Sequence, residues 1–240
     1  MEEAITMINP KDIAVVVHTC PARREKWGPL LDSIEQSDIK NRNVDPYFDL
    51  AIEPKGASNF EKRLHYLSLL CRNARKAPYV LRLEDDIIVN KHILHNLCTW
   101  PALDDPSFGM GLAFVNHLLY ELPQSRDNVS GTFGTFRDPT STPWAQAHFF
   151  KSEHLIPAAQ CYFEELADKH SDYYRRLGKV ALAFDWAITT AMGRMGYNVY
   201  LHQPSLVQCT EVADTRALSG EAVAVPHRAR DFDPDWRRDG

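Results

Sequence analysis

The sequence lacks any long apolar run, since no stretch approaches the ~18 consecutive apolar residues of a membrane-spanning helix. Its acidic start, Met1-Glu2-Glu3, precedes no such run and therefore does not predict a signal peptide. The five cysteines are widely scattered and form no C-x-x-C pair, which argues against a disulfide framework and a structural zinc site. These absences favour a reducing compartment, so we expect a cytoplasmic protein without a membrane span.

The sequence also lacks an excess of positive charge. Its net charge is −5, so no overall basic field draws the chain to nucleic acid or to an anionic membrane. A local basic groove formed by Arg126, Arg137 and the arginines near the C-terminus stays possible. The length of 240 residues, with 44% hydrophobic and 25% charged residues, is typical of a globular protein.

No internal repeat, low-complexity tract or linker divides the chain. We therefore expect a single domain over residues 1–226, followed by a polar tail at 227–240. The tail carries two isolated aromatic residues, Phe232 and Trp236. It is either a disordered end or a segment that folds over the active site with these aromatic residues as anchors.

The central feature of the sequence is the stretch Tyr79–Val89, YVLRLEDDIIV. Its apolar, largely β-branched character predicts a buried strand, and three adjacent carboxylates interrupt it. Burying unpaired carboxylates is costly, whereas a hard divalent cation takes one or two of them as ligands, with phosphate and water as the others. The stretch predicts a Mn²⁺ or Mg²⁺ site for a diphosphate. The alternative is an acidic strand end in solvent.

The segments before this stretch alternate between strand and helix. Residues 13–17 and 47–52 predict strands, and helices are expected after Trp27 and from Ser58 to Pro78. The order β-α-β-α-β indicates an α/β domain with a mostly parallel central sheet flanked by helices. Because ligands bind at the carboxyl ends of such strands, the loops 18–24 and 53–59 should meet the carboxylates at one edge.

The segments after Asp86 predict further elements with a long interruption. Residues 121–144 have no clear period, and a loop of this length is typical of a lid or a binding loop. The expected elements are a short helix at 91–100, strands at 109–115, 145–150 and 197–201, and helices at 155–170 and 184–195.

Several segments, in their order along the chain, resemble segments of the GT-A glycosyltransferases, whose fold is Rossmann-like. Glu84-Asp85-Asp86 resembles their metal-binding D-x-D motif, and residues 145–150 look like their acceptor-side strand. Residues 182–186 are similar to the acidic helix start that often supplies the base. Residues 204–209 are similar to a segment of N-acetylglucosaminyltransferase-like members. The resemblance implies a nucleotide-binding half over about 10–100 and an acceptor half over about 101–226.

The resemblance implies a hexosyl- or pentosyltransferase that depends on a divalent cation. It would move a sugar from a nucleoside-diphosphate sugar to an acceptor hydroxyl, with inversion. The acceptor stays open between a glycan, a small molecule and a modified base in DNA. One alternative is a nucleotidyltransferase, although the loop Thr19–Arg24 lacks the glycines that hold a triphosphate. Another is a non-catalytic module that binds a nucleotide sugar or a glycan.

The resemblance also implies roles for individual residues. Asp86 is the expected metal ligand, and Asp185 is either the general base or simply a helix N-cap. Where related sequences often carry a histidine, this chain has Cys209, so the further ligand is His202, Cys209, His227 or water. Glu84 binds the donor or pairs with Arg82. The remaining predicted contacts are with the donor, at Thr19, Arg23, Arg24, Glu53 and Asp85, and with the acceptor, at Trp144 and His148.

Overall fold

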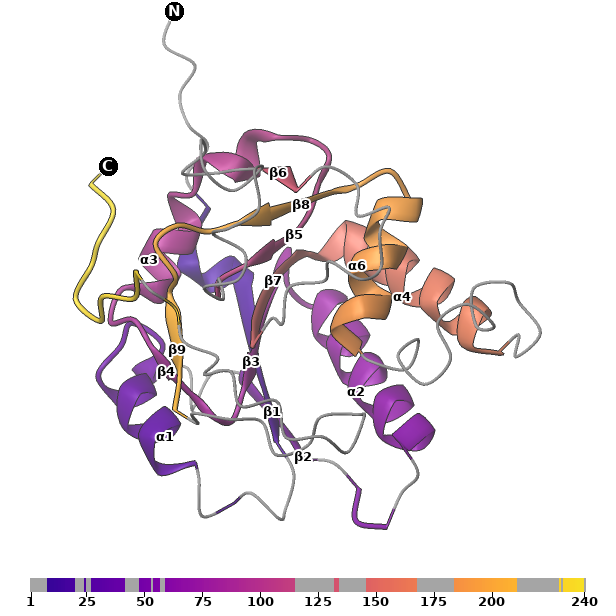
Figure 1. The fold of residues 1–240 in the computed structure, drawn as a ribbon, viewed down its shortest axis with the longest axis horizontal. Helices are drawn as coiled ribbons and strands as arrows, with labels where there is room; N and C mark the ends of the chain where they lie inside the picture. Colours follow the sequence, from indigo (N-terminus) through magenta and orange to yellow (C-terminus); the bar gives the residue numbers. More distant parts are fainter. Residues whose placement is uncertain are drawn as a thin grey trace, which may run out of the picture.

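The computed structural model describes residues 8–19, 24, 27–41, 48–52, 54–56, 59–114, 132–133, 146–167, 184–210, 229 and 231–239. Its centre is a seven-stranded sheet with the strand order β2-β1-β3-β7-β5-β8-β6 (Figure 1). Strands β1, β2, β3, β5 and β8 run in one direction, and β7 and β6 run in the opposite direction. The expected α/β class with a mostly parallel central sheet is confirmed.

The first part of the sheet has the predicted β-α-β-α-β order. It consists of β1 (Ile13–Thr19), α1 (Gly28–Glu35), β2 (Phe48–Ile52), α2 (Asn59–Ala74) and β3 (Tyr79–Glu84). Strand β1 lies between β2 and β3 and pairs in parallel with both. Residues 13–17 of this strand are at most 2% exposed, since helices cover both faces of the sheet at this point.

The second part of the sheet inserts an antiparallel strand. Strand β7 lies between β3 and β5 and is antiparallel to both, which places the later segments beside the nucleotide-binding half predicted above. The elements of this part are β5 (Phe108–Leu112), β6 (Thr132–Phe133), β7 (Ala147–Lys151), α4 (Ser152–Ala167), α6 (Phe184–Arg194) and β8 (Asn198–Leu201).

The carboxylates lie at the end of the third strand, as predicted, but residues 87–89 form a second strand, which was not predicted. Strand β3 ends at Glu84, and the chain bends at Asp85 and Asp86. It then forms β4 (Ile87–Val89), which pairs antiparallel with β9 (Val207–Cys209) in a separate two-stranded sheet. The reason is long-range pairing, because Ile87 lies opposite Cys209 and Val89 opposite Val207.

Two apolar clusters form the core, one on each face of the large sheet. Helices α2, α4 and α6 cover one face, and α1 and the short helix α3 (Ile93–Cys98) lie on the other (Figure 1). Two 3-10 helices, η1 (Pro10–Asp12) and η4 (Pro101–Asp104), precede β1 and β5. None of the described helices has the length and the apolar composition that a membrane crossing needs.

The described part of the tail, residues 231–239, is folded against the body of the protein. The carbonyl of Trp236 accepts hydrogen bonds from the amides of Asn90 and Asn96 at 2.9 and 3.1 Å, and the Arg238 N–H donates to Asn96 Oδ1 at 2.9 Å. The indole of Trp236 packs edge-on against the ring of His202. Of the two alternatives for the tail, a disordered end therefore does not apply to these residues.

Candidate functional site

The carboxylates of the triplet lie where β3 leaves the sheet, at the carboxyl edge shared with β1. Thr19, the last residue of β1, donates a hydrogen bond from Oγ1 to Asp85 Oδ2 across 2.6 Å. The carbonyl of Asp86 accepts from both the backbone N–H and the hydroxyl of Thr210, each at 2.8 Å. Asp85 and Asp86 are 3% and 8% exposed. The bend is therefore held by β1 on one side and by the end of β9 on the other.

Glu84 is held from the opposite face of the sheet. Its Oε1 accepts a hydrogen bond from Arg82 Nη2 at 2.5 Å, so the predicted alternative of a Glu84–Arg82 pair is confirmed. Side chains alternate between the faces of a strand, which puts Arg82 and Glu84 on the side of α2 and Asp85 on the side of α1. Neighbouring carboxylates are thus anchored by different elements.

Arg82 and His148 form a buried pair beneath this edge. Arg82 is 2% exposed and His148 has no exposed surface. Arg82 Nη1 lies 3.1 Å from His148 Nδ1, and these residues are direct partners in the β3–β7 pairing. Burial, and then the nearby guanidinium, lower the pKa of His148 well below its usual range, so the ring is neutral. This placement favours a packing role for His148 over the predicted contact with a sugar.

The start of α6 brings Asp185 to the same edge of the sheet. A Cβ at Gly109, near the start of β5, would lie 3.0 Å from Met192 Sδ, whereas Thr189 contacts Met110 Sδ at 3.9 Å. Helix α6 therefore runs back along β5, and its first turn lies toward the carboxyl end of that strand. Only β7 lies between β3 and β5 in the sheet, so the axes of these two strands are about 10 Å apart.

The position of Asp185 within α6 bears on its predicted role. The helix begins at Phe184, so Asp185 lies in the first turn and is not the residue that precedes the helix. An acidic residue in this turn complements the helix dipole. The backbone of Asp185 is described and its side chain is not, so a role as the base stays a prediction.

The predicted further metal ligand has three candidates. Cys209 of β9 lies opposite Ile87 of β4, the residue that follows Asp86. Its Sγ accepts a hydrogen bond from Gln146 Nε2 at 3.0 Å. His227 lies outside the described residues. Within the described residues, no three His, Cys, Asp or Glu side chains come together to hold a metal ion.

His202, the third candidate, is fully buried. Its Nδ1 is 2.7 Å from the carbonyl oxygen of Pro204, and its ring lies edge-on to those of Trp100 and Trp236. Burial lowers the pKa of His202 to about 3. These contacts describe a neutral core histidine and favour packing over metal ligation.

The structure describes only some of the other residues predicted to contact the donor or the acceptor. Arg24 is exposed, shortly after the end of β1. Arg23, Glu53 and Trp144 lie outside the described residues. The backbone N–H of Glu84 donates to Gln146 O at 3.0 Å, so the segment before β7 reaches the edge of β3. Nothing in the local sequence around Gln146 and Thr210 signals a place at this edge, since strand pairing brings both there.

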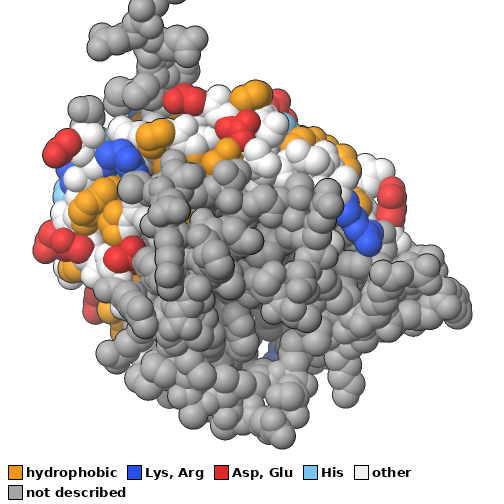
Figure 2. Space-filling model, turned by 45° about the horizontal axis from the view of Figure 1, so that its top comes forward, with side chains coloured by type: hydrophobic (Ala, Val, Ile, Leu, Met, Phe, Trp, Pro, Cys, Tyr) orange, Lys and Arg blue, Asp and Glu red, His pale blue; other side chains and the backbone are white. Residues whose placement is uncertain are grey.

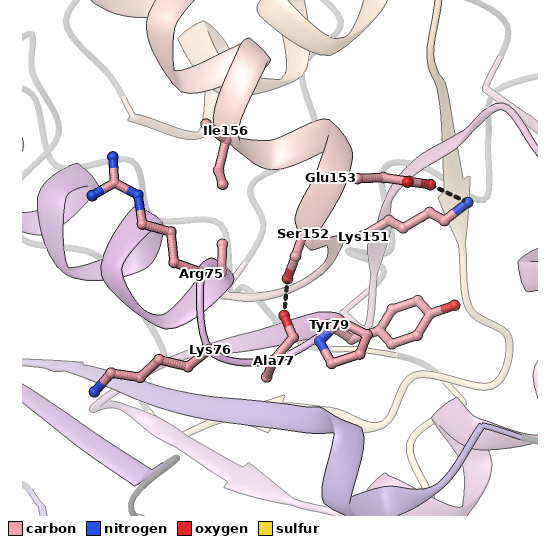
Figure 3. Close-up of a pocket in the computed structure, with 10 residues that line it drawn as sticks. Arg75, Lys76, Ala77, Tyr79, Lys151, Ser152, Glu153 and Ile156 are labelled. Atoms are coloured by element: carbon pink, nitrogen blue, oxygen red, sulfur yellow. Dashed lines mark hydrogen bonds and ion pairs between the residues drawn. The ribbon is translucent and has the colours of Figure 1, made fainter.

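A pocket of about 460 Å³ lies at the opposite edge of the sheet, around the start of β3 and the end of β7 (Figure 3). Arg75, Lys76, Lys151 and Glu153 contribute its charged side chains, and Lys151 is paired with Glu153 at 2.6 Å. Ser152 Oγ donates to the carbonyl of Ala77 at 2.5 Å. This pocket is separated from the triplet by the length of β3 and is not part of the candidate site.

The described side chains on the face in Figure 2 do not form a patch of one charge sign. On the face in Figure 2, acidic, basic and apolar side chains of the described residues are interspersed. The arginines predicted to form a basic groove, Arg126 and Arg137, lie outside the described residues. A nucleic-acid acceptor therefore stays a prediction.

Comparisons with known proteins give one structural likeness and no sequence match. No family model matches the sequence, and no curated protein matches it. Among solved structures, the chain is similar to a crystal structure of a glycosyltransferase involved in the glycosylation of the major capsid of PBCV-1. The identity is 13% and the TM-score 0.44, over 80% of this chain and 81% of that chain. At this level the likeness carries no conclusion about fold or activity.

Proposed function

We propose that this protein is a metal-dependent glycosyltransferase that moves a sugar from a nucleoside-diphosphate sugar to an acceptor hydroxyl with inversion. The observation that carries the proposal is the bend after β3. There, Glu84 ends a buried strand at the carboxyl edge of the sheet and Asp85 and Asp86 follow it, and the first turn of α6 brings Asp185 toward that edge. Ligands of α/β sheets bind at this edge.

The residues present fit a divalent cation that takes few protein ligands. Asp86 would hold Mn²⁺ or Mg²⁺, with the diphosphate and water as the other ligands, which agrees with the lack of a three-residue cluster among the described residues. When bound, the cation would offset the negative charge that develops on the diphosphate leaving group. Cys209 and His227 stay candidates for a further ligand.

The chain's own residues would bind the donor and move a proton. Thr19 holds the Asp85 carboxylate and Thr210 holds the Asp86 backbone, so the strand end is fixed before the donor binds. Arg23, Arg24 and Glu53 would contact the nucleotide. The acceptor oxygen would attack the anomeric carbon as the bond to the diphosphate breaks, and the Asp185 carboxylate would take the hydroxyl proton.

The acceptor is a hydroxyl on a glycan, a small molecule or a modified base in DNA. Trp144 stays the candidate for contact with its sugar or base. The transferred group is a hexose or a pentose. The scattered cysteines support a reducing, cytoplasmic setting.

Thermal denaturation with Mn²⁺ and UDP, GDP, TDP or CDP tests the donor site. A nucleotide at about 100 times its Kd should stabilise the fold by about 2.7 kcal/mol, which raises Tm by about 5–10 °C. The rise should require Mn²⁺ and be lost in Asp86→Asn. Absence of a shift with all four nucleotides would overturn the proposal.

Asp185→Asn separates catalysis from binding. This variant should keep the Mn²⁺-dependent shift and lose transfer, because the amide cannot take the proton. A screen of donor-sugar hydrolysis by the wild-type protein would name the donor without knowledge of the acceptor. Binding without hydrolysis or transfer would favour a binding module, and pyrophosphate release from a nucleoside triphosphate would favour a nucleotidyltransferase.

A further inference from the structure

We propose that Arg82 is a positioning residue of the donor site: its guanidinium, anchored on His148, holds the Glu84 carboxylate in place at the carboxyl edge of β3. The ligand affected is the nucleoside diphosphate, so this part of the inference rests on the proposed function. Arg82 itself is 2% exposed and acts on that ligand only through Glu84.

The position of Arg82 is unusual for a charged side chain. It lies on the central strand β3, where Val16 of β1 and His148 of β7 are its direct partners. A buried guanidinium is costly unless hydrogen bonds and charge partners offset the loss of water. Arg82 meets this need with Glu84 Oε1 at 2.5 Å and His148 Nδ1 at 3.1 Å.

His148 fixes the direction of the guanidinium. Arginine has only donors, so Nδ1 of the neutral imidazole is the acceptor in this contact. Nη1 is directed to His148 and Nη2 to Glu84, and the planar fork cannot turn without losing one of these bonds. The ring of Tyr66 lies against the guanidinium, with its centroid 5.3 Å from Arg82 Cζ.

The side chains packed around Arg82 extend through Tyr66 and His18 toward the carboxyl edge of β3. Tyr66 also stacks on His18 with 4.2 Å between the ring centroids, and His18 is the β1 partner of Glu84 in the sheet. Glu84 is 27% exposed above these side chains and is therefore accessible to a ligand. Asp85 is held separately by Thr19, so the orientation of Glu84 depends on Arg82 and not on the support of its neighbour.

A double-mutant cycle tests whether Arg82 acts through Glu84. The variants are Arg82→Lys, Glu84→Gln and the combination, and the probe is Mn²⁺ with whichever of UDP, GDP, TDP and CDP stabilises the wild-type protein most. Each single variant should weaken binding about tenfold, measured by calorimetry. The double variant should bind as Glu84→Gln does, within about twofold. An unchanged affinity in Glu84→Gln, or multiplication of the two effects, would overturn the proposal.

Two further measurements separate a specific effect from a general one. Arg72→Lys makes the same change at an ion pair with Asp49 where the arginine is 54% exposed, and it should alter binding by less than about twofold. A crystal structure of Arg82→Lys, which needs no ligand, should show the Glu84 side chain turned away from its wild-type position. An unmoved Glu84 would overturn the positioning role.

The outcomes also distinguish this inference from the proposed function. If the wild-type protein binds none of the nucleotides but Glu84 moves in Arg82→Lys, the donor assignment fails and the positioning role stands. If Arg82→Lys does not fold, His148→Gln provides the same comparison. That variant keeps Arg82 and changes only its second anchor, and it should shift Glu84 and weaken binding in the same direction. Failure to do either would overturn the proposal.

Discussion

The hydroxyl of Thr19 donates a 2.6 Å hydrogen bond to the carboxylate of Asp85, although the two residues are 66 positions apart in the chain. Thr19 ends β1 and Asp85 follows β3, and these strands are parallel neighbours. Both residues are 3% exposed. The contact therefore fixes the point where the chain leaves the large sheet, immediately before the predicted metal ligand Asp86.

Replacing Thr19 with valine should loosen this point. Valine keeps the shape of the side chain but removes a donor to a buried carboxylate, which should lower the free energy of unfolding by about 1–3 kcal/mol. Urea denaturation measures the loss, and Mn²⁺-dependent nucleotide binding should weaken in parallel. Thr19→Ser retains the hydroxyl and serves as the control. A loss in Thr19→Ser but not in Thr19→Val would show that the methyl group, and not the hydrogen bond, matters.

The buried histidine His202 should make the protein sensitive to acid. Because burial depresses its pKa to about 3, the folded state binds no proton at His202 between about pH 6.5 and 3, whereas the unfolded state does. Stability should therefore fall as pH falls below about 6.5, by about 2 kcal/mol at pH 5 for this residue alone. Denaturation of wild-type protein and His202→Asn at pH 7 and pH 5 measures the difference.

The control for the acid effect is the comparison of each protein's stability at pH 7 with its own stability at pH 5. His202→Asn is expected to be less stable than the wild type at pH 7, because packing against Trp100 is lost. Its further loss between pH 7 and 5 should nevertheless be smaller than that of the wild type by about 2 kcal/mol. The second buried histidine, His148, is present in both proteins and cancels in the comparison. Equal losses would contradict a neutral His202.

The described tail should be a stabilising part of the domain. Asn96 has no exposed surface, and its amide bonds both Trp236 O and the Arg238 N–H. Asn96→Ala should lower the free energy of unfolding by at least about 2 kcal/mol, since buried polar groups lose their partners. In a chain that ends at Ala229, the same substitution should cost less, because the partners in the tail are gone and only the hydrogen bond to Asn90 Oδ1 remains.

A surface contact of the same tail provides the control. Lys91 and Asp235 form an ion pair at 2.5 Å, with side chains that are 43% and 67% exposed. Lys91→Ala should change stability by less than about 1 kcal/mol, since solvent screens such pairs. If Asn96→Ala costs as much in the shortened chain as in the full one, the contribution of Asn96 does not depend on the tail.

Packing against Trp100 should make Gly111 intolerant of a side chain. A Cβ at Gly111 would lie 2.2 Å from Trp100 Cζ3, and Trp100 is 1% exposed with Phe108 and Tyr200 at its edges. Gly111→Ala should therefore destabilise the protein by about 1–3 kcal/mol, as measured by urea denaturation. Gly28→Ala, where nothing lies within 4 Å of the added Cβ, should be neutral or slightly stabilising. Similar effects at both positions would contradict the close approach.

The local pattern of the sequence was sufficient for the order of elements. The apolar run at 13–17 and the helical spacing after Trp27 and Ser58 depend on neighbours only a few residues away, and they predicted β1, α1 and α2 correctly. Because parallel strands share a carboxyl edge, this order also predicted where the triplet would lie. The pairing of Glu84 with Arg82 could also be predicted from the local sequence, because residues two apart share one face of a strand.

Contacts between distant segments were not predictable in this way. The sequence suggested a strand that ends near the carboxylates, but not that Ile87 pairs with Cys209 and the chain continues into a second sheet. The insertion of β7 between β3 and β5 brings His148 to Arg82, whereas the sequence suggested contact with a sugar. No local pattern indicates which strands become neighbours.

By itself, therefore, the sequence determined the α/β class, the β-α-β-α-β order and the presence of three carboxylates at a strand end, because each follows from local periodicity and residue chemistry. Only the tertiary structure decided that Thr19 and Thr210 hold this strand end from β1 and from the end of β9. The physical reason is that these supports are hydrogen bonds between side chains and strand ends, whose partners are set by the packing of the whole sheet.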